Sequence, residues 1–321
     1  MKKIVISFFS VTFYLFTITP SSYSQGCSDA GLCSIGSMQS ANSVYELSLE
    51  DLMNLEVTNR NRNDHKIILS EIIGIAEDNV LISSTDLSLE FSLDKKTTLF
   101  GKIPYIYTNG NLGSLSGIGD ISFGVKRTVS SNDKYTIDVT LGVQLPVNNS
   151  NLADKNVVLP MPYQTSLGTF DLIVGGSILF EKWHFAAGYQ QVLVNRNENS
   201  FVNPSTPADE GIPYFQSLNL RRGNDLMFRV ERVVNYKKLT FFFGAMPIIR
   251  LNRDEIEFQG ERVELNGTTG PVFNFTAGVL ASLGKKTSLR INTGGPIYNR
   301  RVRTDGLARL IVGIVAIEQR F

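Results

Sequence analysis

The two histidines are the side chains in this sequence best suited to general base chemistry. Phospholipases of bacterial outer membranes need a Ser two residues after the catalytic His, but His184 is followed by Phe-Ala and His65 by Lys-Ile. His184 also comes directly after the short turn "FEKW", which the pattern described below places at the periplasmic end, out of reach of an external substrate. The sequence therefore predicts no enzyme and no cofactor, and His184 is interpreted as a pore-facing or rim residue.

The remaining chemistry lies in charged residues of both signs, spaced along segments that alternate between polar and apolar positions. Such residues would point into the interior of a barrel, where they either pair with one another and stiffen the wall or form a polar path for a solute. Both alternatives stay open. The candidate lumen-lining residues are Asp86, Glu90, Lys102, Asp120, Lys126, Asp138, Asp171, Arg229, Glu231, Arg290 and Glu318.

The elements that must position these charges are long strands. In "KYTIDVTLGVQLPV", residues such as Ile137, Val139 and Leu141 fall on one face, and Asp138 and Thr140 on the other. This alternation is longer than an ordinary globular strand and matches a tilted membrane-spanning strand. The same pattern recurs in "STDLSLEFSL", "GDISFGVK" and "VFNFTAGVLASL".

The connections alternate strictly between short and long. Tight, Lys-bearing turns are "LDKKT", "SSNDKY", "FEKW", "NYKKL" and "LGKKT", and longer polar loops lie at about 108–118, 148–167, 195–222, 252–270 and 297–305. This sorting is typical of an outer-membrane barrel with periplasmic turns and external loops. We therefore predict an all-β, transmembrane antiparallel up-and-down β-barrel over residues 65–321. It has about twelve strands, with ten to fourteen allowed, and both ends in the periplasm.

The N-terminus has the layout of a secretory signal, with Lys2 and Lys3 before an apolar run and small residues before Gln25. We predict a signal peptide over residues 1–24, with a short membrane anchor as the alternative. Residues 25–64 do not alternate, and "SVYELSLEDLMNLEV" is typical of a short amphipathic helix. It forms a periplasmic lead-in or a plug, and it resembles a stretch near the N-terminus of many TonB-dependent receptors.

The only cysteines are Cys27 and Cys33. In an exported protein they can form a small disulfide loop. Lipid attachment at Cys27 is the alternative, although the preceding "YSQG" lacks the apolar residue that a lipoprotein signal needs. A zinc site is disfavoured because the chain has only two histidines.

Charge patterning bears on partners. The formal net charge is +1 and no basic stretch is long, which argues against nucleic acid. The loop "NRRVRTDG" carries Arg300, Arg301 and Arg303. We interpret it either as a solvated loop or as a contact with lipopolysaccharide phosphates.

Two short motifs resemble a known family. "SGIGDISFGVKRTV" and "TSLGTFDLIVGGSI" look like paired motifs of outer-membrane transporters grouped under the meta-pathway of phenol degradation, which are similar in style to FadL-type channels for hydrophobic compounds. The resemblance covers roughly residues 80–321 and implies a transporter of small hydrophobic compounds. It carries over no ligand residues. Gly117, Gly119 and Gly168 have a simpler role as sharp turns from loop into strand.

The chain ends in "RLIVGIVAIEQRF". This segment is predicted to be the last strand, and the terminal Phe321 resembles the signal by which the barrel-assembly machinery recognises its substrates. We therefore predict a protein of the Gram-negative outer membrane, in contact with outer-membrane lipids and lipopolysaccharide. Its expected function is passive passage or uptake of small, hydrophobic molecules, and a non-transporting structural or partner-binding barrel with a blocked lumen is the alternative.

Overall fold

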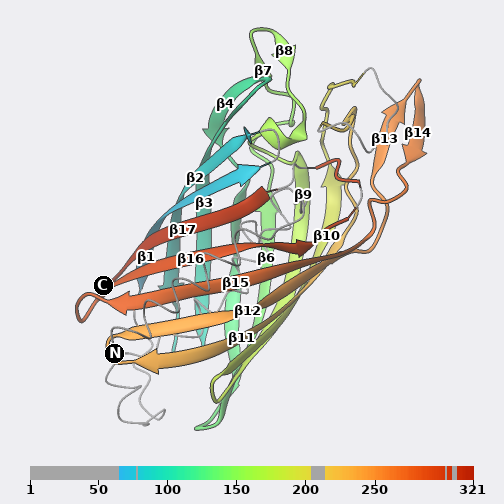
Figure 1. The fold of residues 1–321 in the computed structure, drawn as a ribbon. Helices are drawn as coiled ribbons and strands as arrows, with labels where there is room; N and C mark the ends of the chain where they lie inside the picture. The colour runs from blue at the N-terminus through green and yellow to red at the C-terminus, as the bar shows by residue number, and fades with distance from the viewer. Residues whose placement is uncertain (1–64, 77–78, 204–213, 301, 306–308) are drawn as a thin grey trace.

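The wall of the protein is an antiparallel sheet that closes on itself (Figure 1). The computed structural model describes residues 65–76, 79–203, 214–300, 302–305 and 309–321. Within these residues twelve long strands pair with their neighbours along the chain, and the last strand pairs with the first. The predicted twelve-stranded β-barrel is confirmed.

The wall strands have the length expected for tilted membrane-spanning strands. They are β1 (Lys66–Ala76), β2 (Leu81–Ser92), β3 (Thr97–Gly110), β5 (Ile121–Ser131), β6 (Tyr135–Leu145), β9 (Thr169–Phe180), β10 (Trp183–Asn195), β11 (Asp225–Tyr236), β12 (Leu239–Arg250), β15 (Gly270–Ser282), β16 (Thr287–Tyr298) and β17 (Arg309–Arg320). The connections contain β4 (Gly113–Ile118), β7 (Ala153–Asp154), β8 (Val157–Val158), the 3₁₀ turn η4 (Met161–Tyr163), β13 (Glu255–Phe258) and β14 (Glu261–Glu264).

The five predicted tight turns all lie at one end of the barrel, which is also the end where the C-terminus lies (Figure 1). Side chains close two of them: Asp94 accepts the N–H of Lys96 at 2.6 Å, and Asn132 accepts the N–H of Lys134 at 2.9 Å. In the two shortest turns, Glu181 and Lys237 adopt the left-handed conformation with φ of 50° and 54°. Such backbone is what a two-residue hairpin turn demands.

The opposite end carries the long connections, and here the sequence prediction was wrong in detail. Residues 108–118, expected to be a loop, extend β3 and form β4, so that a hairpin rises above the wall. The expected loop at 252–270 contains the hairpin of β13 and β14. Both segments are rich in polar residues and glycines, which are typical of loops. The sequence therefore does not indicate that they pair as strands.

The seam that closes the barrel joins β1 to β17 in register from Lys66↔Arg320 onward. At its lower edge the N–H of Phe321 donates to the carbonyl of His65 at 3.0 Å. The His65 ring stacks on Phe91 at 4.0 Å between centroids and lies 5.6 Å from the Phe321 ring. The C-terminal residue is thus held against the residue that precedes the first strand.

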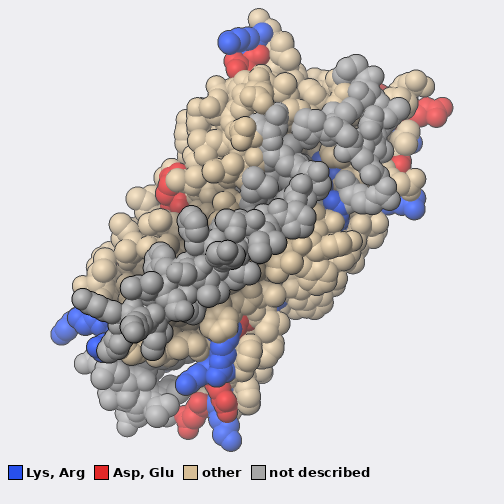
Figure 2. Space-filling model, viewed as in Figure 1, with Lys and Arg blue, Asp and Glu red and all other residues tan. Residues whose placement is uncertain are grey.

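The outer surface of the wall is apolar. Along β6, Val139 and Leu141 are 43% and 51% exposed, and comparable apolar side chains face outward on the other wall strands. Exposed aromatic residues lie toward both ends, with Tyr105 and Tyr298 toward the loop end and Trp183 beside a tight turn. Figure 2 shows charged side chains mainly at the two ends, with a mostly uncharged wall between them. This distribution matches a lipid-facing belt with interfacial aromatic girdles.

Several predictions concern residues 1–64, which lie outside the described residues. They are the signal peptide over 1–24, the helix or plug over 25–64, and the disulfide between Cys27 and Cys33. Among the described residues, none forms a helix long and apolar enough to cross a membrane.

Candidate functional site

Polar side chains gather on the inner face of the barrel because every second residue of a strand points inward. On β6 the buried side chains are those of Thr136, Asp138, Thr140 and Gln144, which alternate with outward apolar residues. The candidate site is therefore the interior of the barrel and the loop network that lies over one end of it.

Near the seam, four interior charges pair across neighbouring strands. The ammonium of Lys66 on β1 lies 3.8 Å from the carboxylate of Glu90 on β2, and Lys102 on β3 lies 3.4 Å from Asp86 on β2. Asp86 also accepts a hydrogen bond from the hydroxyl of Ser84. The predicted candidates Asp86, Glu90 and Lys102 therefore take part in ion pairs that bind the wall together.

On the adjoining wall, Asp138 and Lys126 are both buried, at 2% and 7% exposure. Asp138 accepts a short hydrogen bond, 2.5 Å, from Thr128 Oγ1 on the paired strand β5. Its second oxygen, Oδ2, has no hydrogen-bond partner among the described residues. Leaving a buried carboxylate oxygen without a hydrogen-bond partner costs free energy.

A second interior cluster joins β10, β11 and β15 toward the tight-turn end. Glu231 lies 3.3 Å from His184 Nδ1 and 3.5 Å from Arg229 Nη1, and it accepts a hydrogen bond from Thr276 at 3.2 Å. Arg229 also donates to the sulfur of Met246 at 3.0 Å. His184 is fully buried in this cluster, as an interior polar residue near the turn.

Another interior ion pair lies beside the seam. Arg290 on β16 and Glu318 on β17 are buried, and Arg290 Nη2 lies 2.5 Å from Glu318 Oε1. Because a charge left alone in such a place is costly, each residue depends on the other. The structure thus brings the predicted candidates together in small groups rather than in one continuous lining, and their role in solute passage stays a prediction.

Asp120 occupies a different place from the other candidates, because it precedes β5 instead of lying on it. Its carboxylate accepts the N–H of Leu167 at 2.9 Å and the side-chain amide of Gln144 at 3.0 Å. Burial raises the pKa of Asp120 to about 6, although these hydrogen bonds work against the rise. Asp120 therefore ties the loop before β9 to the top of β5 and β6, and it changes charge at mildly acidic pH.

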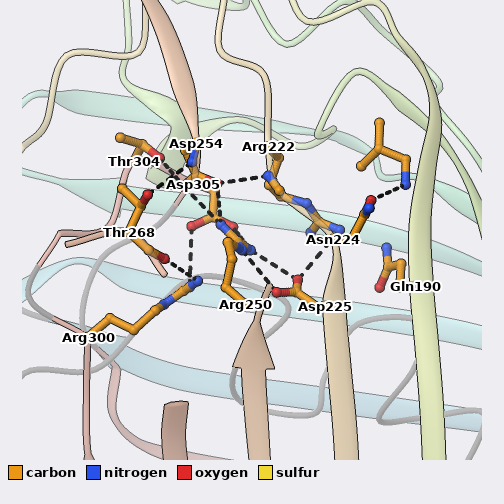
Figure 3. A network of polar contacts seen from close by, with 12 residues as sticks. Gln190, Arg222, Asn224, Asp225, Arg250, Asp254, Thr268, Arg300, Thr304 and Asp305 are labelled. Carbon is orange, nitrogen blue, oxygen red and sulfur yellow. Dashed lines mark hydrogen bonds and ion pairs between the residues drawn. The ribbon is translucent and has the colours of Figure 1, made fainter. Parts of the chain in front are cut away.

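The loop end contains a buried charge network centred on Arg250 (Figure 3). The Arg250 guanidinium contacts three carboxylates: Asp225 with Nε–Oδ1 at 2.9 Å, Asp254 with Nη1–Oδ2 at 3.0 Å, and Asp305 with Nη2–Oδ2 at 2.8 Å. Thr304 donates to Asp254 at 2.6 Å. The network joins the adjacent ends of β11 and β12 to two connections, one with Asp254 and one with Thr304 and Asp305.

Two further arginines complete this network. Arg222 lies 3.3 Å from the predicted candidate Asp171 and 3.7 Å from Asp225, and Arg300 lies 4.0 Å from Asp305. Burial opposes the charged form of Arg222, but Asp171 and Asp225 outweigh it and raise the pKa of Arg222. Likewise, burial favours neutral Asp305, but Arg250 and Arg300 dominate and lower its pKa. Arg222 and Asp305 therefore stay ionised at neutral pH.

The burial of Arg300 and Arg303 differs from the sequence prediction of a solvated loop. Arg300 is 4% exposed and donates to the carbonyl of Thr268 at 3.0 Å, and Arg303 is 8% exposed. The third arginine of that loop, Arg301, lies outside the described residues. Lipopolysaccharide phosphates could reach the two buried guanidinium groups only if the network opened.

The loops also pack by apolar contacts over this end. Tyr163, at the end of η4, is fully buried and shares a hydrogen bond of 3.0 Å with the hydroxyl of Tyr214. The carbonyl of Tyr163 accepts a hydrogen bond from Thr108 on β3 at 2.9 Å. Val80 and Leu115 belong to the same buried cluster. Loop residues 148–167 therefore fold against the tops of β2, β3 and β4.

The described residues contain no group of three or more His, Cys, Asp or Glu side chains arranged to hold a metal ion. An apolar cluster does stand out inside the wall. Ile173, Met227, Met246 and Ile248 are buried together on the inner side of β9, β11 and β12. Sequence reasoning missed it, because these positions resemble ordinary members of alternating strands.

Comparison with known proteins gives a fold relationship. A crystallised outer membrane channel from Pseudomonas putida F1 matches with a TM-score of 0.58 at 12% sequence identity, covering 81% of this chain and 96% of that one. The KdgM porin and the NanC porin match with TM-scores of 0.41, at 8% and 9% identity, over 80% of this chain and 99% and 98% of theirs. No family model matches the sequence, and no curated protein matches it.

At this level of identity the likeness to the Pseudomonas channel extends to the fold. The chain has the closed, antiparallel barrel architecture of outer-membrane channels. The resemblance to transporters of the phenol meta-pathway stays a prediction, since the fold alone does not select that group.

Proposed function

We propose that this protein is a channel of a Gram-negative outer membrane, through which small molecules pass without an energy source. The observation that carries the proposal is the two-sided wall: apolar side chains face outward and charged or polar ones face inward. A polar inner face is typical of outer-membrane barrels whose interior holds water. The channel fold of the Pseudomonas protein supports the same proposal.

The interior favours solutes that combine a polar and an apolar part. Buried charges such as Glu231 and Arg229 lie on the same strand as Met227 of the apolar cluster, and Arg229 contacts Met246 of that cluster. A small aromatic anion would find both environments. The sequence resemblance implied hydrophobic solutes, and we now expect these solutes to carry a polar group as well.

Proteoliposome swelling tests the proposal. Liposomes with the refolded chain should swell in arabinose and in a small aromatic sulfonate. Swelling in the sulfonate should be faster than diffusion of the sulfonate through lipid allows. Liposomes with heat-denatured protein supply the baseline. Equal swelling with folded and denatured protein would contradict a channel, and swelling in arabinose alone would contradict the preference for aromatic anions.

A second candidate, a barrel with a blocked lumen, is favoured by one observation. Inward residues of β9, β10 and β11 are inaccessible, with Asp171, His184 and Met227 all 0% exposed. Residues 25–64, predicted as a lead-in or a plug, supply a test. Conductance that appears only after their deletion identifies a plugged channel, and its absence in both forms identifies a structural barrel.

The proposed location implies its partners. An outer-membrane barrel contacts the lipids of that membrane, lipopolysaccharide included, and depends on the barrel-assembly machinery for insertion. Phe321 is 56% exposed at the open edge of the seam, which suits recognition of the chain end. Nucleic acid is not among the proposed partners, in keeping with the balanced charge.

A further inference from the structure

A cleft of about 710 Å³ lies beside β10 at the loop end, outside the interior clusters. It occurs where the pairing of β10 with β11 stops, at Gln190↔Asp225, although β10 continues to Asn195. Two hydrogen bonds bridge this gap: the Val192 N–H donates to Asn224 Oδ1, and Asn195 Nδ2 donates to the Leu220 carbonyl, both at 3.0 Å. The cleft is therefore a built feature of the wall.

The lining of the cleft is rich in arginine. It contains five arginines against two glutamates and no lysine or aspartate. One glutamate, Glu255, is already 3.8 Å from Arg221. The arginines are Arg196, Arg221, Arg222, Arg253 and Arg262. Five guanidinium groups around one space favour an anion that accepts several hydrogen bonds, because the planar fork of Arg matches phosphate oxygens.

The arginines retain donors for such a ligand. In the described part of the chain, the Arg196 side chain makes no hydrogen bond or ion pair. Arg262 uses one nitrogen on the carbonyl of Asn219. Nε of Arg222 is buried and has no hydrogen-bond partner among the described residues, while its Nη2 is held by Asp171. The cleft thus has both free and pre-positioned donors.

The same cleft is apolar on its membrane side. Val192, Leu193 and Val194 belong to its lining, and the last two are each 48% exposed on the lipid-facing surface. From Trp183 at the tight-turn end, β10 climbs to Leu193 by roughly 25 Å along the membrane normal, which is the height of the apolar belt. The arginines therefore lie at the boundary between lipid chains and head groups.

We propose that this cleft binds a phosphate group carried by a glycolipid of the outer leaflet, with its acyl chains along Leu193 and Val194. The assignment rests on the proposed outer-membrane location but not on solute passage. The sequence interpretation assigned a lipopolysaccharide contact to the loop with Arg300 and Arg303. Because these two side chains are buried, we assign the contact to the arginines of the cleft instead.

Native mass spectrometry of the refolded mature chain in detergent tests this site. The probe is lipid A with two phosphates, and inorganic phosphate is the competing probe. We expect one tightly bound lipid A, and on the order of tenfold weaker binding for the double substitution Arg196→Gln with Arg262→Gln, because two charge-assisted contacts are lost. Arg127→Gln is the control, an exposed arginine on β5 toward the tight-turn end, and should bind like wild type.

Heat-modifiable migration checks that each variant is folded. Equal lipid A binding in all three proteins, or none in any, would overturn the proposal. Displacement of lipid A by an equal concentration of inorganic phosphate would also overturn it, since the site would then recognise a free small anion. If the double substitution alters lipid binding alone, conductance should stay the same as in wild type. Measuring conductance therefore distinguishes a failure of this site from a failure of the channel.

Discussion

The Arg250 side chain donates two parallel hydrogen bonds to Asp225, from Nε to Oδ1 at 2.9 Å and from Nη2 to Oδ2 at 3.0 Å. The two residues face each other across the β11–β12 ladder. Because Arg250 also contacts Asp254 and Asp305, one buried guanidinium ties two connections to the ends of β11 and β12. Among the described residues, this network therefore ties parts of the loop end to the rim of the barrel.

Arg250→Gln should destabilise the protein strongly. Three buried carboxylates would lose their common cation, and breaking a buried ion pair costs about 3–5 kcal/mol. The free energy of unfolding in guanidinium, followed by fluorescence of the single Trp183, measures the loss. Arg253→Gln is the matched control, since Arg253 pairs with Glu264 at 3.0 Å on the surface and such pairs contribute about 0–1 kcal/mol. Similar losses in both variants would refute this role of Arg250.

Asp120 should make stability depend on pH between about 4 and 6. Its pKa of about 6 in the folded chain exceeds the ordinary value of 3.8, so the folded state holds the proton more tightly than the unfolded state. The resulting stabilisation is complete below the lower value and is lost as pH rises through the higher one, by at most about 3 kcal/mol. The Asp120 side chain is only half-buried, so screening by water lowers this free energy below about 3 kcal/mol.

Unfolding at pH 4.5 and 7.5 measures this effect. Asp120→Asn should remove that part of the pH dependence, whereas Asp133→Asn, in an exposed tight turn, should keep it. If Asp120→Asn unfolds with the pH dependence of wild type, another group is responsible.

Gly168→Ala should weaken the loop before β9. Gly168 has φ of +69°, and an added Cβ would lie 2.9 Å from the Asn197 Cα, which is backbone and cannot move aside cheaply. Left-handed strain and the clash together cost about 1–3 kcal/mol. Gly284→Ala is the control, because nothing lies within 4 Å of the position that its new methyl group would take. Equal unfolding free energies for the two variants would contradict the argument.

Phe321→Ala should lower the amount of assembled barrel in a Gram-negative host. The substitution keeps the backbone bond to His65 but removes the aromatic ring that lies against it. Heat-modifiable protein in outer-membrane fractions measures assembly. Phe243→Ala removes an aromatic ring that is 54% exposed on β12 and serves as the control. Unchanged barrel levels for Phe321→Ala would argue against an assembly signal at the chain end.

The barrel could be predicted from the sequence because its information is local. Alternation in β6, from Tyr135 to Leu145, depends on the period of a single strand, and turn residues such as Asp94 and Asn132 close hairpins within a few residues. These features do not depend on the rest of the fold, so strand number and the inward face followed directly.

The loop network could not be predicted, because its partners meet only after the loops fold. Arg250 ends β12 whereas Asp305 lies in the connection between β16 and β17, and nothing in "NRRVRTDG" indicates that Arg300 is buried. One signal was present: the tight turn at Lys237 sets the hairpin register, which places Asp225 opposite Arg250. That pair was available from the sequence, but its links to Asp254 and Asp305 were not.

Single-channel recording in planar lipid bilayers tests the central claim most directly. The refolded mature chain should give discrete conductance steps, and Asp138→Asn should shift the ion preference toward anions by removing a buried interior negative charge. Val139→Asn, at the neighbouring outward position, should leave the ion preference unchanged. No steps with the mature chain, or steps whose ion preference ignores Asp138, would contradict a channel through this barrel.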